Sequence, residues 1–208
     1  MCGFVGYVND TPDKSVNEKI IKDMADRIRH RGPDQDDYYV DSSVSLGFRR
    51  LSIIDLDGGS QPILNEDGTK VLVFNGEIYN YQPIREELIK KGHVFRTKTD
   101  SEVLLHGYEE YGCELLNKLR GMFAFVIWDS TEKKLFGARD IFGIKPFFYY
   151  LKNGNFLFGS EIKSFLSNPL FEKELNEERL PDYLCFEYIP TTETMFKNVY
   201  KMEPGSYF

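Results

Sequence analysis

Cysteine and histidine, the residues that build disulfide frameworks and zinc sites, are scarce in this chain. Its 208 residues include three of each, namely Cys2, Cys113, Cys185, His30, His93 and His106. No two cysteines form a Cys-x-x-Cys pair, and the histidines are scattered along the sequence without the spacing of metal ligands. We therefore expect neither a disulfide scaffold nor a metal site.

Long apolar runs and an excess of basic residues are also missing. No apolar stretch approaches the roughly 20 residues that a helix needs to span a bilayer, and we recognise no secretory segment. The net charge is −7, whereas nucleic-acid-binding proteins usually carry a basic footprint. Short basic clusters such as Arg49–Arg50 suit a carboxylate or a phosphate better than a nucleic acid. We expect a reduced, cytoplasmic protein with neither a nucleic acid nor a membrane as partner.

Hydrophobic residues, at 41% of the sequence, are abundant enough to fill a sizeable core. Between residues 15 and 30, Val16, Ile20, Met24 and Ile28 recur every four positions, which predicts an amphipathic helix. A capping-box pattern, Thr99 with Glu102, predicts the start of another. The helices expected in the whole chain lie at residues 15–30, 82–93, 99–112, 160–167 and 176–185.

Strand-like runs come in hairpin-like groups separated by turn signals. They lie at residues 2–8, 38–40, 44–54, 71–74, 122–129, 134–140, 145–151 and 155–160. Because the helices cluster between these groups, the pattern favours an α+β fold with layered antiparallel sheets over an alternating parallel fold. Residues beyond about 168 form a more irregular part.

The second residue, Cys2, follows a start methionine of the kind that is readily removed before a small residue. Removal of Met1 would give Cys2 a free amine. A thiol has an ordinary pKa near 8.5 and an α-amine one of about 7.7–8.0. The amine can therefore act as general base for the thiol of its own residue. The competing interpretation is a small buried hydrophobic residue, and position alone favours that interpretation.

The segment FNGEIYN, residues 74–80, offers hydrogen-bond donors after an apolar run. Taken alone, Asn75–Gly76 is best interpreted as a hairpin turn. The same pair also presents a side-chain amide beside a backbone N–H, two donors that can converge on a developing oxyanion. The adjacent Glu77 adds a carboxylate that could hold a substrate ammonium group.

Two more charged residues stand at the ends of expected elements. Arg50 lies where a strand gives way to a loop that contains Gly58 and Gly59. Arginine binds carboxylates through two parallel hydrogen bonds, and a glycine-containing loop can close over a ligand. Asp100 lies at an expected helix start. Taken singly, a solvated surface arginine and a helix-capping aspartate are the commoner interpretations.

Together, these residues match a free α-amino acid that bears a side-chain amide. The arginine would bind the carboxylate, and the two acids would bind the ammonium group. The thiol would attack the amide carbon while the two donors hold the amide oxygen. Glutamine is a substrate of that kind.

Eight motifs occur in order along the chain, namely MCGFVGY, RHRGPD, RLSIIDLDGGSQPI, NGEIYNY, TDSEV, GMFAF, RDIFGIKPFFY and EIKSF. In this order they resemble the class II glutamine amidotransferase domain, an N-terminal-nucleophile glutaminase, of glutamine-hydrolysing asparagine synthetases. The resemblance covers nearly the whole chain. RLSI and NGEIYN point to the asparagine-synthetase branch rather than to the phosphosugar and purine-pathway amidotransferases.

This resemblance implies a four-layer αββα sandwich of the N-terminal-nucleophile hydrolase type, with two mainly antiparallel sheets. It implies that Cys2 is the nucleophile and that Asn75 and Gly76 form the oxyanion hole. The substrate contacts that it implies are Arg50, Leu51, Ile53, Ile54, Glu77 and Asp100. It assigns no place in the site to Arg49, and it leaves HRGPD and RDIFGIKP mainly structural.

The implied reaction is hydrolysis of L-glutamine to L-glutamate and ammonia through a γ-glutamyl thioester, with no metal or organic cofactor. We expect residues 1–208 to be the glutaminase domain and a C-terminal synthetase domain to follow in the full-length protein. That domain, which would carry an SGGxDS-type loop and use ATP and Mg²⁺ to make asparagine, would be the partner that receives the ammonia.

Two other functions stay open. The domain could serve a different carboxylate acceptor, such as a sugar acid or a secondary-metabolite precursor. Alternatively, it could bind glutamine with little turnover. The oligomeric state is also open, with a homodimer among the options.

Overall fold

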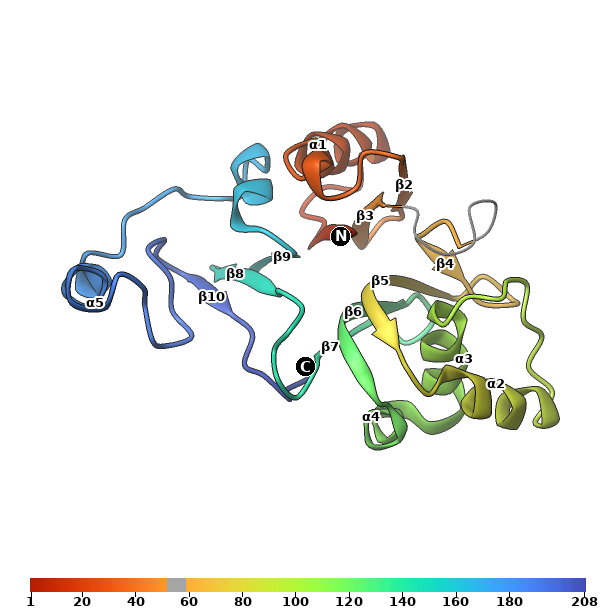
Figure 1. Ribbon diagram of the computed structural model, residues 1–208. Coiled ribbons are helices and arrows are strands. Elements are labelled where there is room, and N and C mark those ends of the chain that lie inside the picture. The colour runs from red at the N-terminus through yellow and green to blue at the C-terminus, as the bar shows by residue number, and fades with distance from the viewer. Residues whose placement is uncertain (52–58) are drawn as a thin grey trace.

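Two antiparallel sheets form the centre of the computed structural model, which describes residues 1–51 and 59–208 (Figure 1). The larger sheet has the order β10 (Val199–Lys201), β8 (Phe148–Lys152), β9 (Asn155–Gly159), β1 (Gly3–Val8), β3 (Val44–Arg50) and β2 (Gln35–Val40). The smaller sheet has the order β4 (Ile63–Leu64), β5 (Lys70–Ile78), β6 (Gly121–Asp129) and β7 (Lys134–Arg139). Every strand pairing in the described residues is antiparallel, as predicted.

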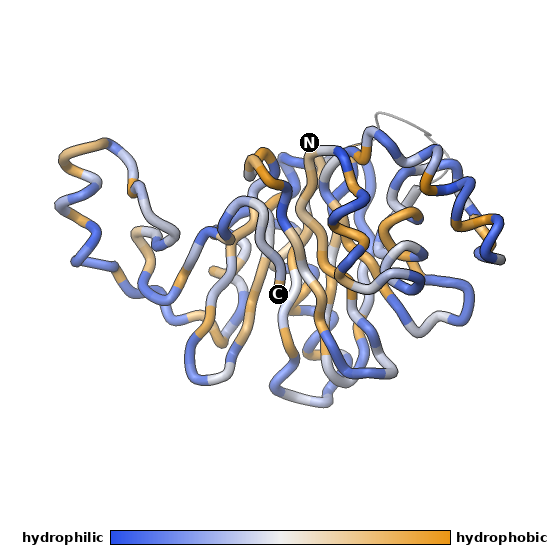
Figure 2. The backbone as a smooth tube through the Cα atoms, turned by 90° about the horizontal axis from the view of Figure 1, so that it is seen from below, coloured by the Kyte–Doolittle hydropathy of each residue, from blue (hydrophilic) through white to orange (hydrophobic). Residues whose placement is uncertain are grey.

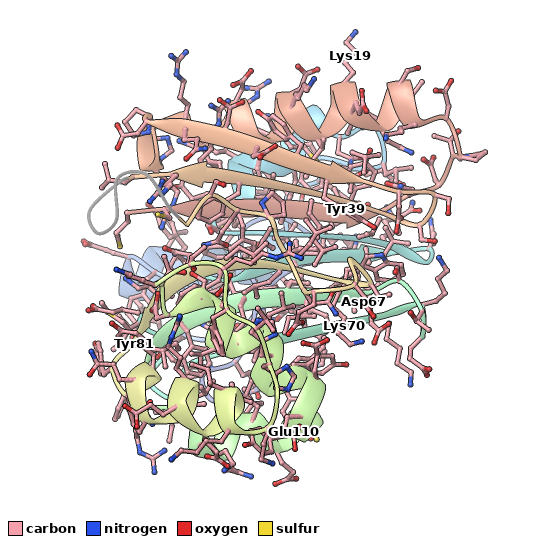
Figure 3. The ribbon with its side chains drawn as sticks, turned by 90° about the vertical axis from the view of Figure 1, so that its right-hand side faces the viewer. Lys19, Tyr39, Asp67, Lys70, Tyr81 and Glu110 are labelled. Carbon is pink, nitrogen blue, oxygen red and sulfur yellow. The ribbon has the colours of Figure 1, made fainter. Side chains whose placement is uncertain are left out.

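Helices cover the outer faces of both sheets. The larger sheet is covered by α1 (Lys14–Asp26) and the 3₁₀ helix η3 (Ile162–Ser167). The smaller sheet is covered by α2 (Tyr81–Lys90), α3 (Ser101–Tyr111) and α4 (Leu115–Lys118). Shorter elements complete the chain, namely η1 (Arg29–Arg31), η2 (Gly112–Glu114), η4 (Glu177–Arg179) and α5 (Leu180–Phe186). Figure 3 shows the four layers edge-on, with Lys19 of α1 and Glu110 of α3 on opposite outer sides. The predicted αββα sandwich is therefore confirmed.

Three hydrophobic clusters fill the spaces between the four layers. The strand period of two divides the residues among them, because successive side chains point to opposite faces of a sheet. Val71 and Val73 of β5 join the cluster between the sheets, whereas Leu72 and Phe74 pack beneath α2 and α3. The third cluster lies between α1 and the larger sheet. In Figure 2 the central strands are largely hydrophobic and the outer loops hydrophilic.

The C-terminal part is less regular than the sandwich, as expected. Figure 1 shows α5 at some distance from the layers, and the chain then returns through β10. The last residues lie beside the smaller sheet, where Tyr207 bridges to Ala138 of β7. Among the described residues, no helix combines the length and the apolar character that crossing a membrane requires.

The turn predicted at Asn75–Gly76 is wrong, because both residues lie inside β5. This strand pairs with β6 over its whole length, with Gly76 opposite Phe123 and Ile78 opposite Gly121. The two backbones approach so closely that a Cβ atom on Gly76 would lie 2.2 Å from the Met122 carbonyl oxygen. The glycine therefore serves strand contact rather than a turn.

Other element ends also differ from the sequence expectation. The predicted helix over residues 15–30 divides into α1 and η1, and the strand expected over 44–54 ends at Arg50, its last positions lying outside the described residues. The prediction of a capping box formed by Thr99 and Glu102 is also wrong. Asp100 holds the N-cap position of α3, and Glu102 instead accepts hydrogen bonds from the backbone N–H groups of Arg96 and Thr97.

Candidate active site

A cavity of about 350 Å³ lies at one end of the space between the two sheets. Along β1, β3 and β5, the positions that face this space are apolar over most of each strand, with Phe4, Phe48 and Val73 among them. At the cavity end the same faces continue with Cys2, Arg50 and Asn75, all of which line the cavity. The strand alternation that builds the core thus also gathers these three polar side chains.

Cys2 is half-buried at the start of β1, and its thiol contacts the chain just after β3. The Leu51 N–H donates to Sγ at 3.4 Å, and Sγ lies 3.6 Å from the Leu51 carbonyl oxygen. The Cys2 carbonyl accepts a hydrogen bond of 2.9 Å from Nε of Arg31, which also pairs with Glu161 at 3.1 Å. These contacts hold the carbonyl group and the thiol of Cys2 in place. The preceding residue, Met1, is 60% exposed to solvent.

Asn75 is almost fully buried, at 2% exposure, and its side chain lines the cavity. Its Nδ2 atom has no hydrogen-bond partner among the described residues. A buried donor without a partner costs about 1–3 kcal/mol of stability. Such a group is rare in native proteins and calls for an explanation, for which a bound ligand is one candidate.

The backbone of Gly76 lies on an edge of β5 where β4 no longer pairs. Gln61, which is buried, takes the place of a strand partner for Phe74, accepting from its N–H at 2.6 Å and donating to its carbonyl at 3.0 Å. Farther along, Asp100 accepts from the N–H of Ile78 at 2.8 Å. Backbone groups of alternate strand residues point to the same edge. The Gly76 amide therefore lies between these two anchored positions and beside the cavity.

Arg50 and Arg49 are adjacent in sequence but serve different faces of β3. Arg50 lines the cavity, is 7% exposed, and donates to Oε1 of Gln35 at 3.2 Å. Arg49 pairs with Asp26 and Asp36 and does not line the cavity. Thus Arg50, and not its neighbour Arg49, lines the cavity.

Two carboxylates border the cavity from the smaller sheet and α3. Glu77 is exposed, whereas Asp100 is half-buried beneath its contact with Ile78. Burial raises the pKa of the Asp100 carboxyl above its usual value, and the nearby Glu77 charge acts in the same direction. A cationic group placed beside both would relieve this repulsion. The pair is therefore suited to an ammonium group.

The cavity brings together most of the predicted site residues and several that were not predicted. Cys2, Arg50, Leu51, Asn75, Gly76, Glu77 and Asp100 all line it. Ile53 and Ile54 lie outside the described residues. Gln61, Met122 and Lys145 also line the cavity and escaped prediction. Gln61 belongs to the RLSIIDLDGGSQPI motif and Lys145 to the RDIFGIKP motif, so both motifs marked their regions without singling out these residues.

The RDIFGIKP motif positions Lys145 through one buried aspartate. Asp140 accepts hydrogen bonds from four backbone N–H groups, those of Phe123, Phe142, Ile144 and Lys145, at 2.9–3.2 Å. This arrangement ties the loop after β7 to β6. The carboxylate therefore organises the loop rather than reaching the cavity.

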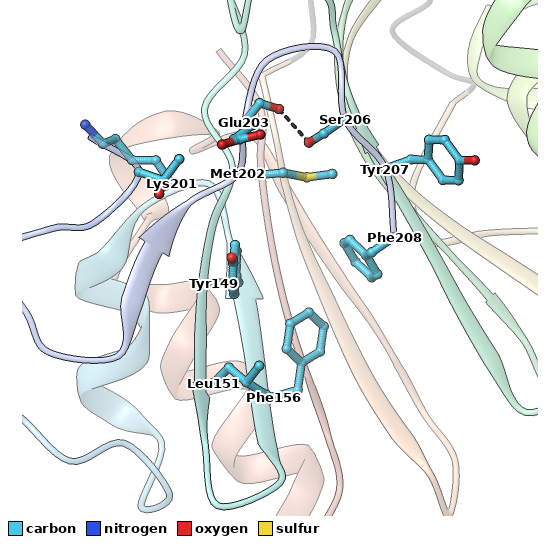
Figure 4. A pocket seen from close by; sticks show the side chains of 10 residues that line it. Tyr149, Leu151, Phe156, Lys201, Met202, Glu203, Ser206, Tyr207 and Phe208 are labelled. Carbon is cyan, nitrogen blue, oxygen red and sulfur yellow. Dashed lines mark hydrogen bonds between the residues drawn. The ribbon is translucent and has the colours of Figure 1, made fainter. Parts of the chain in front are cut away.

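A second cavity, of about 380 Å³, lies beside β8 and the C-terminal segment (Figure 4). It is lined by Tyr149, Leu151, Phe156, Thr192, Lys201, Met202, Glu203, Ser206, Tyr207 and Phe208. Within the described part of the chain, this lining contains neither a cysteine nor a histidine. The Cys2 cavity is therefore the candidate for nucleophilic chemistry.

Two solved structures share this architecture. A glutamine phosphoribosylpyrophosphate amidotransferase from B. subtilis matches with a TM-score of 0.66 at 20% identity, over 84% of this chain and 45% of that chain. An allosteric regulatory enzyme of purine biosynthesis matches with a TM-score of 0.59 at 20% identity, over 80% and 43%. At this identity the similarity shows the fold alone, which this chain shares with both enzymes.

The sequence identifies the family of the chain. It matches the glutamine amidotransferase domain family over residues 1–208, and the chain belongs to that family. Asparagine synthetase (glutamine-hydrolyzing) 1 of Bacillus subtilis is 49% identical over all of this chain and 33% of its own length. Asparagine synthetase (glutamine-hydrolyzing) 2 of the same organism is 43% identical over all of this chain and 28% of its own length. The chain thus spans about a third of the length of these curated relatives.

Proposed function

We propose that this domain hydrolyses L-glutamine to L-glutamate and ammonia, with Cys2 as the nucleophile. The observation that carries the proposal is that Asn75, which lines the same cavity as Cys2, has a buried Nδ2 without a hydrogen-bond partner among the described residues. A donor held ready in this way stabilises an oxyanion without reorganisation during the reaction.

The charged groups around the cavity suit the two ends of a free amino acid. Arg50 would bind the α-carboxylate through its planar guanidinium, which matches a carboxylate in shape and charge. Glu77 and Asp100 would bind the α-ammonium group. An amino acid held in this way directs its side-chain amide along the cavity toward Cys2, and contacts at both ends favour glutamine over shorter or decarboxylated amides.

The proposed reaction has two acyl-transfer steps. The Cys2 thiol gives its proton to its own α-amine, once Met1 is removed, and the sulfur attacks the side-chain amide carbon of glutamine. The oxyanion that forms accepts hydrogen bonds from Asn75 Nδ2 and the Gly76 N–H. Protonation of the amide nitrogen releases ammonia and leaves a γ-glutamyl thioester. Water then attacks the thioester, which gives glutamate and restores the thiol.

This sequence of steps requires only the protein, glutamine and water. The thiol supplies the nucleophile, the amine moves the proton, and the two N–H donors balance the developing charge. We propose that glutamine hydrolysis by this domain uses no metal or organic cofactor. ATP and Mg²⁺ would belong to a synthetase domain elsewhere in the full-length protein.

The relatives support a place for this domain in a longer protein. They are named as glutamine-hydrolysing asparagine synthetases, and this chain spans about a third of their length. We propose that residues 1–208 form the glutaminase domain and that its ammonia passes to a C-terminal synthetase domain, which makes asparagine. All three cysteines are free thiols, which agrees with a reducing cytoplasmic location.

Release of glutamate from L-glutamine tests the proposal directly. Intact mass first establishes that Met1 is absent from the sample, and a glutamate-dehydrogenase assay then measures turnover. Wild type should release glutamate and ammonia in equal amounts, whereas Cys2→Ala should release neither. If the processed wild type releases no more glutamate than Cys2→Ala, the enzyme proposal fails. In that case, a higher melting temperature in the presence of glutamine would identify a binding module instead.

A further inference from the structure

Two histidines and two glutamates gather where the β4–β5 turn meets α3. They are Glu66, His93, His106 and Glu109, and one ligand atom from each lies within 4.8 Å of the other three. None of the four lines the cavity that holds Cys2. We propose that this cluster is a binding site for a divalent transition-metal ion of the zinc type.

The four side chains come from three separate segments. Glu66 lies in the turn between β4 and β5, and His93 lies in the connection between α2 and α3. His106 and Glu109 are three residues apart on α3, so their side chains share one face of that helix. A metal ion would therefore cross-link all three segments.

The spacing of the ligand atoms suits tetrahedral coordination. His106 Nδ1 lies 3.0 Å from Glu109 Oε2 and 3.3 Å from Glu66 Oε2. His93 Nδ1 lies 3.6 Å from Glu66 Oε1 and 3.8 Å from Glu109 Oε2. A tetrahedral zinc site with bonds of about 2.0–2.1 Å has ligand–ligand edges of about 3.4 Å. These four histidine–glutamate distances bracket that value, although the two that involve Glu66 are to different oxygens, and one ligand atom from each of the four residues lies within 4.8 Å of the others.

Further contacts hold these ligands in place. Asn65 Nδ2 donates to Oε1 of Glu109 at 2.6 Å, which leaves Oε2 for the centre of the cluster. The Val94 N–H donates to Oε1 of Glu66 at 3.0 Å. The side chain of His106 is only 3% exposed. Hydrogen bonds to the ligating carboxylates and burial of a ligating ring are characteristic surroundings of metal ligands in proteins.

The donor set selects the kind of metal. Neutral imidazole nitrogens together with carboxylate oxygens suit zinc and its neighbours, whereas magnesium and calcium prefer oxygen ligands alone. Two carboxylates also balance the charge of a divalent ion. Four protein ligands make a closed site, which is the arrangement of structural rather than catalytic zinc. The metal would thus brace the connection that leads from α2 to Thr99 and Asp100 at the cavity.

Calorimetric titration of the chelator-treated protein with ZnCl₂ tests the proposal. Because the Cys2 thiol could bind zinc by itself, the titration is made in a Cys2→Ala background, where the outcome does not depend on glutamine hydrolysis. We expect one zinc ion per chain, a higher melting temperature with zinc, and no comparable effect of MgCl₂. CoCl₂ should give the visible absorption of tetrahedral cobalt.

Single substitutions locate the binding. His93→Gln and Glu66→Gln change partly exposed side chains, and each should weaken zinc binding by about tenfold or more. The matched controls are His30→Gln, in η1, and Glu18→Gln, on α1, which lie away from the cluster and should leave zinc affinity within about threefold of the parent. Absence of stoichiometric zinc binding in the parent would overturn the proposal, as would equal affinity in His93→Gln. The cluster would then be an ion-pair network alone.

Discussion

Asn75→Ala separates catalysis from stability at one buried position. Asn75 lines the cavity that contains Cys2, and within residues 1–51 and 59–208 its buried Nδ2 has no hydrogen-bond partner. Loss of one oxyanion donor lowers turnover by about 10²–10³, which corresponds to about 2.7–4 kcal/mol of transition-state stabilisation. The same substitution removes an unsatisfied buried group that costs about 1–3 kcal/mol. This gain offsets the packing lost with the side chain, so the free energy of unfolding should not fall by more than about 1 kcal/mol.

Asn17→Ala is the matched control, because Asn17 is also a buried asparagine but has hydrogen-bond partners for both its side-chain oxygen and its side-chain nitrogen. It accepts from the Tyr7 hydroxyl at 2.9 Å and donates to the Thr11 carbonyl at 2.8 Å. Its loss leaves buried groups unpaired, which should lower the free energy of unfolding by about 1–3 kcal/mol. Glutamine turnover should stay close to that of wild type, because Asn17 lies in α1 and does not line the Cys2 cavity.

Initial rates of glutamate release, together with urea unfolding curves, measure both quantities in the same preparations. The expected result is opposite behaviour: Asn75→Ala loses turnover and keeps stability, whereas Asn17→Ala keeps turnover and loses stability. The oxyanion assignment is refuted if Asn75→Ala retains turnover within about threefold of wild type. If Asn75→Ala instead unfolds several kcal/mol more easily, the buried amide serves the fold.

Three further substitutions test the remaining groups of the cavity. Arg50→Lys removes the guanidinium fork, so KM for glutamine should rise by about tenfold or more while kcat changes less; steady-state kinetics would contradict this if KM stayed within threefold. Burial raises the Asp100 pKa, so ionisation destabilises the folded wild type as pH rises through that pKa. The melting temperature of Asp100→Asn should therefore rise relative to that of wild type as the pH increases, and a pH-independent difference in melting temperature would argue against this. At neutral pH, KM of Asp100→Asn for glutamine should be higher than that of wild type. Gln61→Ala should cost about 1–3 kcal/mol in urea unfolding through the lost contacts with Phe74, and an unchanged midpoint would contradict that.

Strand periodicity explains why much of the fold and site could be predicted from the sequence. The α+β class with layered antiparallel sheets follows from hairpin-like strand groups with helices between them, whereas the four-layer αββα arrangement came from the family resemblance. Arg49 and Arg50 were assigned different places by family motif, and the alternation of β3 gives the physical reason. The same alternation places Cys2, Arg50 and Asn75 at the end of faces that are otherwise apolar.

Other features depend on contacts between distant segments and leave no local signal. Asn75–Gly76 has the composition of a tight turn, but pairing with β6 across the whole of β5 overrides that preference. Gln61 fills a place in a ladder only because β4 ends early. His93 and His106 have no metal-ligand spacing along the chain, yet the packing of α3 against the β4–β5 turn brings their rings to a centroid distance of 5.1 Å.

The early end of β4 leaves one edge of β5 near Gly76 without a paired strand among the described residues. Ile63 pairs with Leu72, so a longer β4 continuing in register would set Gly59 opposite Gly76. Its backbone would then take the Gly76 amide into the sheet ladder and close that edge of the cavity. The amide stays available to a ligand because the sheet is incomplete there, while the Gln61 side chain seals the adjacent position.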